Sequence, residues 1–325
     1  MQRRLFLAIA GSAVATASLL RSPDAMADEP WPSRPIRLVV PFAPGGSNDV
    51  LARRLAVSLG NALGQAVVVD NRAGGGSTIG ANYVAMSPAD GYTFLFVSGS
   101  IATTAAVQKV PYDPLTAFTP ISRVASAPFV VLTRNGFPAK TMPDLIAYAK
   151  ANPGKINYGS AGLGDSTQLA TELLSNIAGI KMQGVPYKGI APAQLDVIAG
   201  RTDLVITTMA SIRGTPAEQL PMLAFTSATR DPDHPGVPTV KESTGLDYVV
   251  DVWWGMFGPK NLPTAIRDRV NKEIAIAAAD PDFKAFVKGV GALPAPSSPE
   301  VLQELLVQDV KRWTETAQRA GIALQ

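Results

Sequence analysis

Residues 36–59 constrain the fold of this 325-residue chain more than any other stretch. The apolar run IRLVV at their start is typical of a buried strand, and leucines spaced four residues apart, from 51 to 59, then mark one face of a helix. Between them, PGGS (44–47) predicts a turn, and Ser47 or Asn48 can cap the helix. Such a turn presents free main-chain N–H groups at the positive end of a helix dipole, where an anion can bind without a basic side chain.

A second copy of this pattern occupies residues 156–177, INYGSAGLGDSTQLATELLSNI. A short strand ends near Tyr158, a glycine and serine turn follows, and Asp165 or Ser166 can cap the next helix. Binding at micromolar affinity requires about 8 kcal/mol, whereas one helix terminus contributes roughly 0.3 to 1 kcal/mol. One turn is therefore insufficient, and we expect the two turns to face each other around a ligand. The alternative is that each glycine turn serves only to reverse the chain.

Short apolar strands alternate with helices along the chain, which predicts an α/β fold with a mostly parallel sheet. The carboxyl ends of parallel strands meet at one edge of a sheet, and ligands bind there. The turns at 41–48, 71–79 and 98–104 are therefore expected to converge. Two extended segments, 121–133 and 220–226, are interpreted as crossings between two lobes.

The predicted export signal and the two crossings together divide the chain into three parts. Residues 1–27 are read as an export signal, residues 28–123 together with 229–325 as the first lobe, and residues 124–228 as the second. Two α/β lobes joined by paired crossings form a hinged clamp that can close around a ligand.

The export signal is predicted from the first residues. Arg3 and Arg4 precede an apolar run over 5–20, and Ala25-Met26-Ala27 has the small-x-small pattern of a cleavage site. The apolar run is short of the ~20 residues needed to span a bilayer. We therefore expect a periplasmic protein, and the paired arginines leave a twin-arginine export route open beside the general one.

Charge and composition exclude several classes of function. The formal charge of +3 falls to +1 once the three arginines and one aspartate of residues 1–27 are removed, which gives no basic patch for nucleic acid. The sequence has no cysteine, so disulfides and thiolate metal sites are excluded. We expect no cofactor, no metal and a monomeric protein.

No set of residues demands catalysis. His234 is the only histidine, and it lies in a proline-rich loop where a solvated surface role is expected. Residues 158–162, YGSAG, approach the nucleophile elbow G-x-S-x-G but have tyrosine in place of the first glycine. An exported α/β hydrolase that uses Ser160 is therefore the alternative hypothesis. Trp253 and Trp254 are expected in the core rather than against a ligand ring.

Several ordered motifs together resemble one known family. They are PFAPGGSNDVLAR (41–53), NPGKINYGSAGLG (152–164), VPYKGIAPA (185–193) and PGVPTV (235–240). The chain resembles the extracytoplasmic solute-binding receptors of tripartite tricarboxylate transporters, the Bug or TctC-type family. The resemblance implies a type II periplasmic-binding-protein fold, with two α/β lobes joined by two crossing strands around a cleft. It also implies no enzymatic activity, and delivery of a small aliphatic or aromatic mono- or dicarboxylate to membrane permease subunits. A sensory role that hands the ligand to a signalling partner stays open.

The resemblance also implies a set of ligand-binding residues. Matched motif by motif, they are Phe42, Ala43, Ser47 and Asp49 in the first turn and Ser160, Ser166 and Thr167 in the second. Neighbouring positions complete the predicted site, namely Ser98, Ala161, Tyr187, Asp203 and Thr207. Two positions depart from the family pattern: Gln168 stands where a histidine is frequent, and Thr207-Thr208 where an acidic or amide pair is common. The resemblance therefore does not identify which carboxylate this chain binds.

Overall fold

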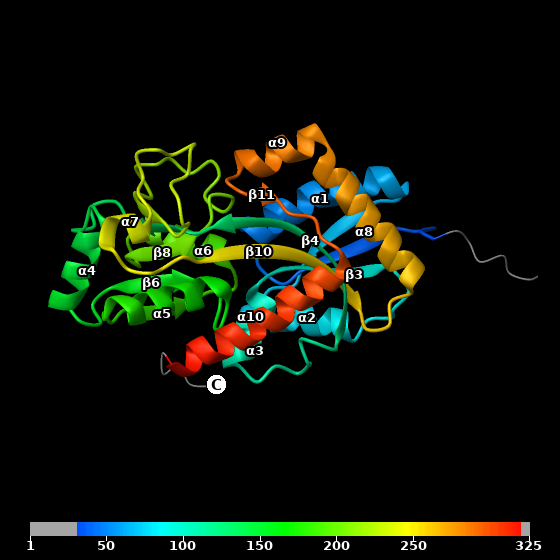
Figure 1. Ribbon diagram of the computed structural model, residues 1–325, viewed down its shortest axis with the longest axis horizontal. Coiled ribbons are helices and arrows are strands. Elements are labelled where there is room, and N and C mark those ends of the chain that lie inside the picture. Colours follow the sequence, from blue (N-terminus) through cyan, green and yellow to red (C-terminus); the bar gives the residue numbers. More distant parts are fainter. Residues whose placement is uncertain (1–30, 320–325) are drawn as a thin grey trace, which may run out of the picture. The chain divides into compact units, whose positions relative to one another are not determined.

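Two β-sheets organise the chain in the computed structural model, which describes residues 31–319 (Figure 1). The predicted export signal lies outside the described residues. The six-stranded sheet contains β1 (Ile36–Val40), β2 (Val67–Asn71), β3 (Thr93–Ser98), β4 (Phe118–Pro128), β10 (Asp251–Pro259) and β11 (Leu293–Pro294), in the order β11-β4-β10-β3-β1-β2. The five-stranded sheet contains β5 (Val130–Thr133), β6 (Asn157–Ser160), β7 (Gln183–Pro186), β8 (Leu204–Thr207) and β9 (Met222–Phe225), in the order β7-β6-β8-β5-β9.

Helices pack on both sheets. Those associated with the six-stranded sheet are α1 (Ser47–Leu63), the short 3-10 helix η1 (Gly75–Ser77), α2 (Thr78–Ala85), α3 (Ser100–Val107), α8 (Thr264–Ala279), α9 (Pro281–Gly289) and α10 (Pro299–Arg319). Those associated with the five-stranded sheet are α4 (Met142–Ala151), α5 (Ser166–Ala178), α6 (Ile190–Ile198) and α7 (Val240–Thr244). We call each sheet with its helices the six-stranded half and the five-stranded half. No helix among residues 31–319 has both the length and the apolar character needed to cross a membrane.

Each sheet has a parallel part, as predicted from the sequence. β1 lies between β2 and β3 with all three parallel, and β6 lies parallel between β7 and β8. Leu38 of β1 is opposite Val69 and Phe94, and it is fully buried, which explains why β1 is apolar apart from the exposed Arg37. β10 and β5 run antiparallel to their neighbours. In each half, the turns that follow the parallel strands therefore emerge at one edge.

Two segments connect the halves. β4 continues through Phe129 directly into β5, so the first predicted crossing is confirmed (Figure 1). The second crossing lies later than predicted. β9 pairs within the five-stranded sheet, and the chain returns only at Val250 and β10, which runs antiparallel beside β4. The sequence could not place this return, because β9 and β10 are both largely apolar and neither carries a local signal of the sheet it joins. The lobe boundaries at 123/124 and 228/229 stay a prediction.

The two crossings meet at Thr226. Its hydroxyl oxygen accepts a hydrogen bond from the Phe129 main-chain N–H at 2.8 Å and donates to the Val250 carbonyl at 2.5 Å. Its own N–H donates to the Phe129 carbonyl at 2.9 Å, and its carbonyl accepts from the Val250 N–H at 3.1 Å. Thr226 is fully buried, so it joins both connections at the point where a hinge between the halves would lie.

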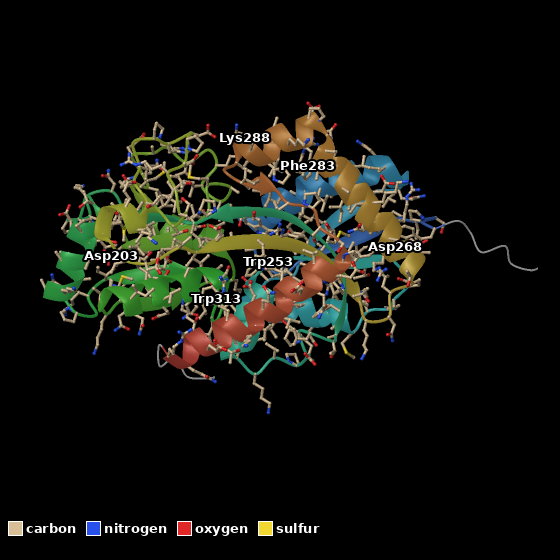
Figure 2. The ribbon with its side chains drawn as sticks, in the orientation of Figure 1. Asp203, Trp253, Asp268, Phe283, Lys288 and Trp313 are labelled. Atoms are coloured by element: carbon tan, nitrogen blue, oxygen red, sulfur yellow. The ribbon has the colours of Figure 1, made fainter. Side chains whose placement is uncertain are left out.

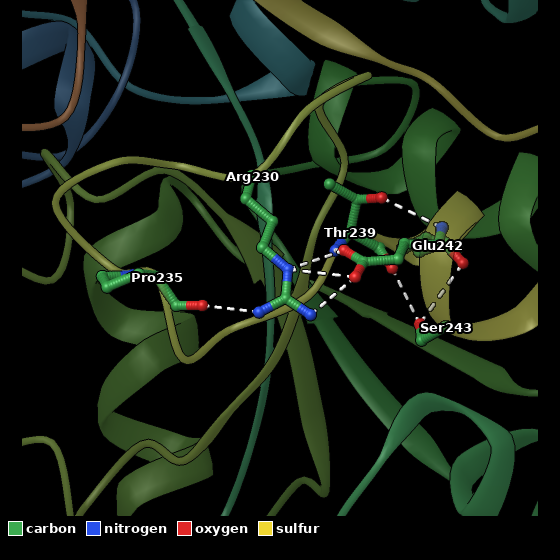
Figure 3. A network of polar contacts seen from close by, with 6 residues as sticks. Arg230, Pro235, Thr239, Glu242 and Ser243 are labelled. Carbon is green, nitrogen blue, oxygen red and sulfur yellow. Dashed lines mark hydrogen bonds and ion pairs between the residues drawn. The ribbon is translucent and has the colours of Figure 1, made fainter.

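The proline-rich connection 230–238 is tied to α7 (Figure 3). The Arg230 guanidinium bonds the Glu242 carboxylate, with Nε 2.8 Å from Oε2, and it also donates to the Pro235 carbonyl at 2.6 Å. Glu242 and Thr239 form a capping box at the start of α7. Although an exposed ion pair contributes little on its own, these contacts together fix the loop against the helix.

Trp253 and Trp254 lie in the core, as predicted. Trp254 is fully buried and Trp253 is 5% exposed, both in β10. The Trp253 indole N–H donates to the Asp309 carboxylate of α10 at 2.6 Å, where β10 and α10 meet (Figure 2). The Gly99 N–H donates to the Trp253 carbonyl at 2.9 Å, so Trp253 also supports the turn that follows β3.

Candidate functional site

The turns after β1 and β6 face one another across a small cavity of about 20 Å³. The cavity lies at the carboxyl ends of the parallel strands of both sheets, where α/β proteins bind ligands. Its lining residues come from both halves and are Phe42, Gly46, Ser47, Asn48, Ser98, Phe129, Ala161, Asp165, Ser166, Thr167, Ile190, Thr207, Thr208 and Val252.

Helix α1 begins at this cavity without a side-chain cap. Neither Ser47 nor Asn48 caps it, contrary to the sequence prediction, because the N-cap position falls on Gly46, which has no side chain to donate an oxygen. The Ser47 N–H donates to the Ser211 hydroxyl of the other half at 3.0 Å. The Asn48 side-chain oxygen is buried and has no hydrogen-bond partner among the described residues. No side chain caps α1 by a hydrogen bond, although the Asp49 carboxylate lies in its first turn, so the positive end of the helix dipole can still attract a negatively charged group in the cavity.

Helix α5 begins differently. The Asp165 carboxylate caps it by accepting hydrogen bonds from the N–H groups of Thr167 and Gln168 at 3.0 and 3.1 Å. Burial raises the pKa of Asp165 to about 6, although these hydrogen bonds act in the opposite direction. The expectation of free amides at both turns is thus wrong for the second turn, whose helix terminus already holds its own carboxyl group.

Hydroxyl groups connect the two halves beside these helix ends. The Ser98 and Ser100 hydroxyls are 2.9 Å apart, and the Ser166 N–H donates to the Ser100 hydroxyl at 3.2 Å. The Thr167 hydroxyl donates a hydrogen bond to the Asp165 carboxylate at 2.8 Å. Among the described residues that line the cavity, none has a cationic side chain. The site therefore offers a helix dipole, hydroxyls, the Asn48 amide and the Asp165 carboxyl group to a ligand.

The remaining wall of the cavity is apolar. Phe42 and Ile190 come from the turn after β1 and the start of α6, whereas Phe129 and Val252 come from the two crossings. All four side chains are at least 95% buried. A ligand here would place polar groups toward the α1 terminus and the hydroxyls, and its carbon atoms toward this wall.

Seven of the twelve predicted site residues line the cavity, namely Phe42, Ser47, Ser98, Ala161, Ser166, Thr167 and Thr207. The other five are held in contacts elsewhere. The Ala43 N–H donates to the Lys188 carbonyl at 2.9 Å, and Asp49 accepts from the Gly45 N–H at 3.0 Å and pairs with Arg53. The Ser160 hydroxyl is buried and points toward the Gly162 carbonyl, 3.4 Å away. That the predicted residues contact a ligand stays a prediction.

Tyr187 and Asp203 also lie away from the cavity. The Tyr187 hydroxyl donates to Asp196 at 2.6 Å. Asp203 pairs with Arg134 at 2.9 Å and accepts from the Asn157 N–H at 3.0 Å, at the amino ends of β8 and β6 (Figure 2). Because ligands bind at the carboxyl ends of such strands, Asp203 lies at the edge of the sheet opposite the cavity.

Seven residues that line the cavity are not among the predicted site residues, namely Gly46, Asn48, Phe129, Asp165, Ile190, Thr208 and Val252. Gly46, Asn48 and Asp165 belong to turns that the sequence predicts, and Thr208 directly follows the predicted site residue Thr207. Phe129 and Val252 reach the cavity only because the two crossings pass beside it. No local sequence signal marks these two positions.

One expectation about a neighbouring segment needs correction, and His234 lies away from the site. The turn at 71–79 does not line the cavity and instead contacts the loop before α5. His234 pairs with Asp231 at 2.8 Å and lies beside Phe225, in a separate cavity of about 380 Å³ formed by loops near residues 209–217 and 288–291. The only histidine of the sequence therefore makes its contacts away from Ser160.

Comparison with known proteins identifies relatives over nearly the whole chain. Residues 51–322 match the model of the tripartite tricarboxylate transporter family receptor, TctC. A UPF0065 protein from the tcbD-tcbE intergenic region of Pseudomonas sp. strain P51 is 39% identical, over 92% of this chain and 90% of its own length. Protein BugT of Bordetella pertussis is 33% identical over 100% of both chains.

Three solved structures with the same fold are similar to this chain over most of its length. The periplasmic binding protein BugD has a TM-score of 0.87 and 35% identity, over 91% of this chain and 100% of its own. R. palustris Rpa4515, solved with adipate, has a TM-score of 0.87 and 36% identity, over 90% and 99%. MatC from Rhodopseudomonas palustris, with bound malate, has a TM-score of 0.83 and 28% identity, over 88% and 99%.

Proposed function

Because the chain belongs to the tripartite tricarboxylate transporter receptor family, we propose that it captures a small organic carboxylate between its two halves and delivers it to membrane permease subunits. Its fold is that of the two-lobed periplasmic binding proteins. As a member of a receptor family it is a solute-binding protein and not an enzyme, and the hydrolase alternative based on Ser160 is wrong.

The α1 terminus carries this proposal. It opens onto a cavity lined by hydroxyls, and the Ser47 and Asn48 side chains lie beside it. A hydrogen bond to a charged group contributes about 1.5 to 3 kcal/mol, so three or four such bonds to a carboxylate reach the 8 kcal/mol or so of micromolar binding. Binding proteins of this fold hold adipate and malate, which supports an aliphatic dicarboxylate as the first class to test.

The size of the cavity indicates that the halves move. About 20 Å³ is enough for roughly one water molecule, whereas a carboxylate with several carbon atoms is larger. Entry of such a ligand requires the facing turns to separate, and a fold with two connecting segments closes and opens by hinge motion. We infer that the facing turns lie close together in this structure and separate when a ligand enters.

Titration calorimetry with a carboxylate panel tests the proposal. The panel includes adipate, malate, a monocarboxylate and an aromatic carboxylate, and an uncharged diamide matched to adipate is the control. We expect micromolar binding of at least one carboxylate and none of the diamide. Binding of none of the carboxylates at millimolar concentration would overturn the proposal.

The cellular role needs separate measurements. We propose a periplasmic, monomeric protein, to be examined by cell fractionation and by light scattering of the purified protein. Co-purification of permease subunits with the ligand-loaded receptor is expected for transport. Co-purification of a signalling protein instead would indicate a sensory receptor.

A further inference from the structure

The third glycine turn has an unusual backbone. Gly74, Gly75 and Gly76 have φ values of 135°, 59° and 62°, and Ser77 follows with φ of 107°. Positive φ is uncommon for a residue with a side chain, and such strained positions occur where surrounding contacts enforce them. Ser77 is fully buried. The turn is therefore held in one conformation, although it lines no part of the ligand cavity.

This turn touches the loop that precedes α5 in the other half. A Cβ atom on Gly76 would collide with the Leu163 carbonyl oxygen, and a Cβ atom on Gly162 would lie 2.9 Å from the Gly76 Cα. Only glycine permits so close an approach of two main chains. Loop 161–164 therefore packs backbone to backbone against the six-stranded half.

Helix α3 adds two side-chain contacts to this packing. The Thr104 hydroxyl lies 2.6 Å from the Gly76 carbonyl and 3.3 Å from the Gly164 carbonyl, and it can donate to either. The Gln108 side-chain amide donates to the Leu163 carbonyl. Thr104 is fully buried, and α3 is in contact with α5. The donors belong to the six-stranded half, whereas the Leu163 and Gly164 acceptors belong to the five-stranded half.

Loop 161–164 leads directly into the ligand cavity. Ala161 and Asp165 at its two ends line the cavity, but Thr104 and Gln108 do not. We propose that Thr104 and Gln108 are positioning residues that latch this loop in place, and that they set the lifetime of the closed form without touching the ligand. The effect on ligand release rests on the proposed function, whereas the latch itself acts on closure with or without ligand.

The hydrogen bonds of the latch to the five-stranded half exist only while the halves are together. Separation leaves the Gln108, Leu163 and Gly164 groups to water, whereas Thr104 keeps its hydrogen bond to the Gly76 carbonyl of its own half. Each bond between the halves therefore contributes the modest net free energy of a neutral hydrogen bond. Loss of one bond is expected to raise the ligand dissociation rate about three- to tenfold. The ranking of different carboxylates should stay unchanged, because no ligand contact is altered.

Single-molecule fluorescence energy transfer on the ligand-free protein tests the latch directly. The sequence has no cysteine, so Val57→Cys on α1 and Ile177→Cys on α5 give one exposed labelling site in each half. We expect Thr104→Val and Gln108→Leu each to shift the population toward lower transfer efficiency. Thr171→Val is the matched control, since the buried Thr171 hydroxyl bonds Thr167 within its own helix.

A second measurement follows dissociation of adipate by stopped flow in the same variants. Faster release with an unchanged ranking of carboxylates supports the latch. Efficiency distributions identical to wild type in both variants would overturn it. If the wild-type protein binds no carboxylate, the proposed function is wrong. The transfer-efficiency distributions of the ligand-free protein still show whether Thr104 and Gln108 hold the halves together. Should Thr104→Val not fold, Gln108→Leu at its half-buried position gives the test alone.

Discussion

The hydroxyl oxygens of Ser100 and Ser166 lie 3.2 Å apart, although Ser100 begins α3 in the six-stranded half and Ser166 begins α5 in the five-stranded half. Ser98 extends this contact at 2.9 Å from Ser100. The contact joins the two halves at the wall of the cavity. A ligand that enters there meets hydroxyls supplied by both halves at once.

Replacing Ser166 with alanine is therefore expected to weaken carboxylate binding about tenfold or more, since one hydrogen bond to a charged group is lost. Calorimetry measures the change. Ser175→Ala is the matched control, because Ser175 lies on the same helix and its hydroxyl bonds the Thr171 carbonyl away from the cavity. Equal affinities of the wild type and Ser166→Ala would show that Ser166 does not contact the ligand.

Ser47→Ala is expected to lower affinity by a similar factor while leaving the unfolding free energy nearly unchanged. Ser47 is 8% exposed and lines the cavity, but it does not cap α1, so little helix stability depends on its hydroxyl. Ser58→Ala, about three turns further along α1, serves as the control. A loss of thermal stability equal to the loss in binding would instead indicate a structural role.

The sequence predicted most elements of the fold but only part of the site. The strand and the helix predicted within residues 36–59 are β1 and α1, and the leucines at 51, 55 and 59 are buried on one face of α1, as their spacing predicts. Helix α3 was missed, because SIATTAAV follows a strand and resembles a continuing turn. Within the site, polar residues at strand ends could be predicted, whereas Phe129 depends on how a crossing passes the cavity.

Asp165→Asn is expected to remove a pH dependence of stability. The pKa of Asp165 is raised to about 6 in the folded protein, compared with an ordinary value near 3.9. The folded state therefore binds the proton more tightly, and the unfolding free energy falls as pH rises from about 4 to about 6. Asp165 accounts for a decrease in unfolding free energy of about 3 kcal/mol, because each pKa unit corresponds to about 1.36 kcal/mol.

Urea unfolding between pH 4 and pH 7 measures this difference. Asparagine keeps an oxygen that can cap α5, so the variant should fold and should lose less stability than the wild type as the pH rises. Parallel stability profiles for the two proteins would contradict the assignment.

Thr226→Val is expected to lower the unfolding free energy by about 1 to 3 kcal/mol, because the buried Phe129 N–H loses its hydroxyl partner. Thr226→Ser retains the hydroxyl and is the control. Chemical denaturation measures both. A stability of Thr226→Val equal to that of Thr226→Ser would show that the hydroxyl does not hold the two crossings together.

Phe129 belongs to the ligand cavity and to the first crossing at the same time. Its side chain lines the cavity in which we propose that a carboxylate binds, and its main chain is hydrogen-bonded to Thr226 of the returning segment. A longer molecule that pushes this side chain acts on the pivot itself, so the length of the cargo and the angle of the clamp are linked through one residue. On the proposed function, a permease that recognises the clamp angle would distinguish correct cargo from oversized cargo without contacting the cargo itself.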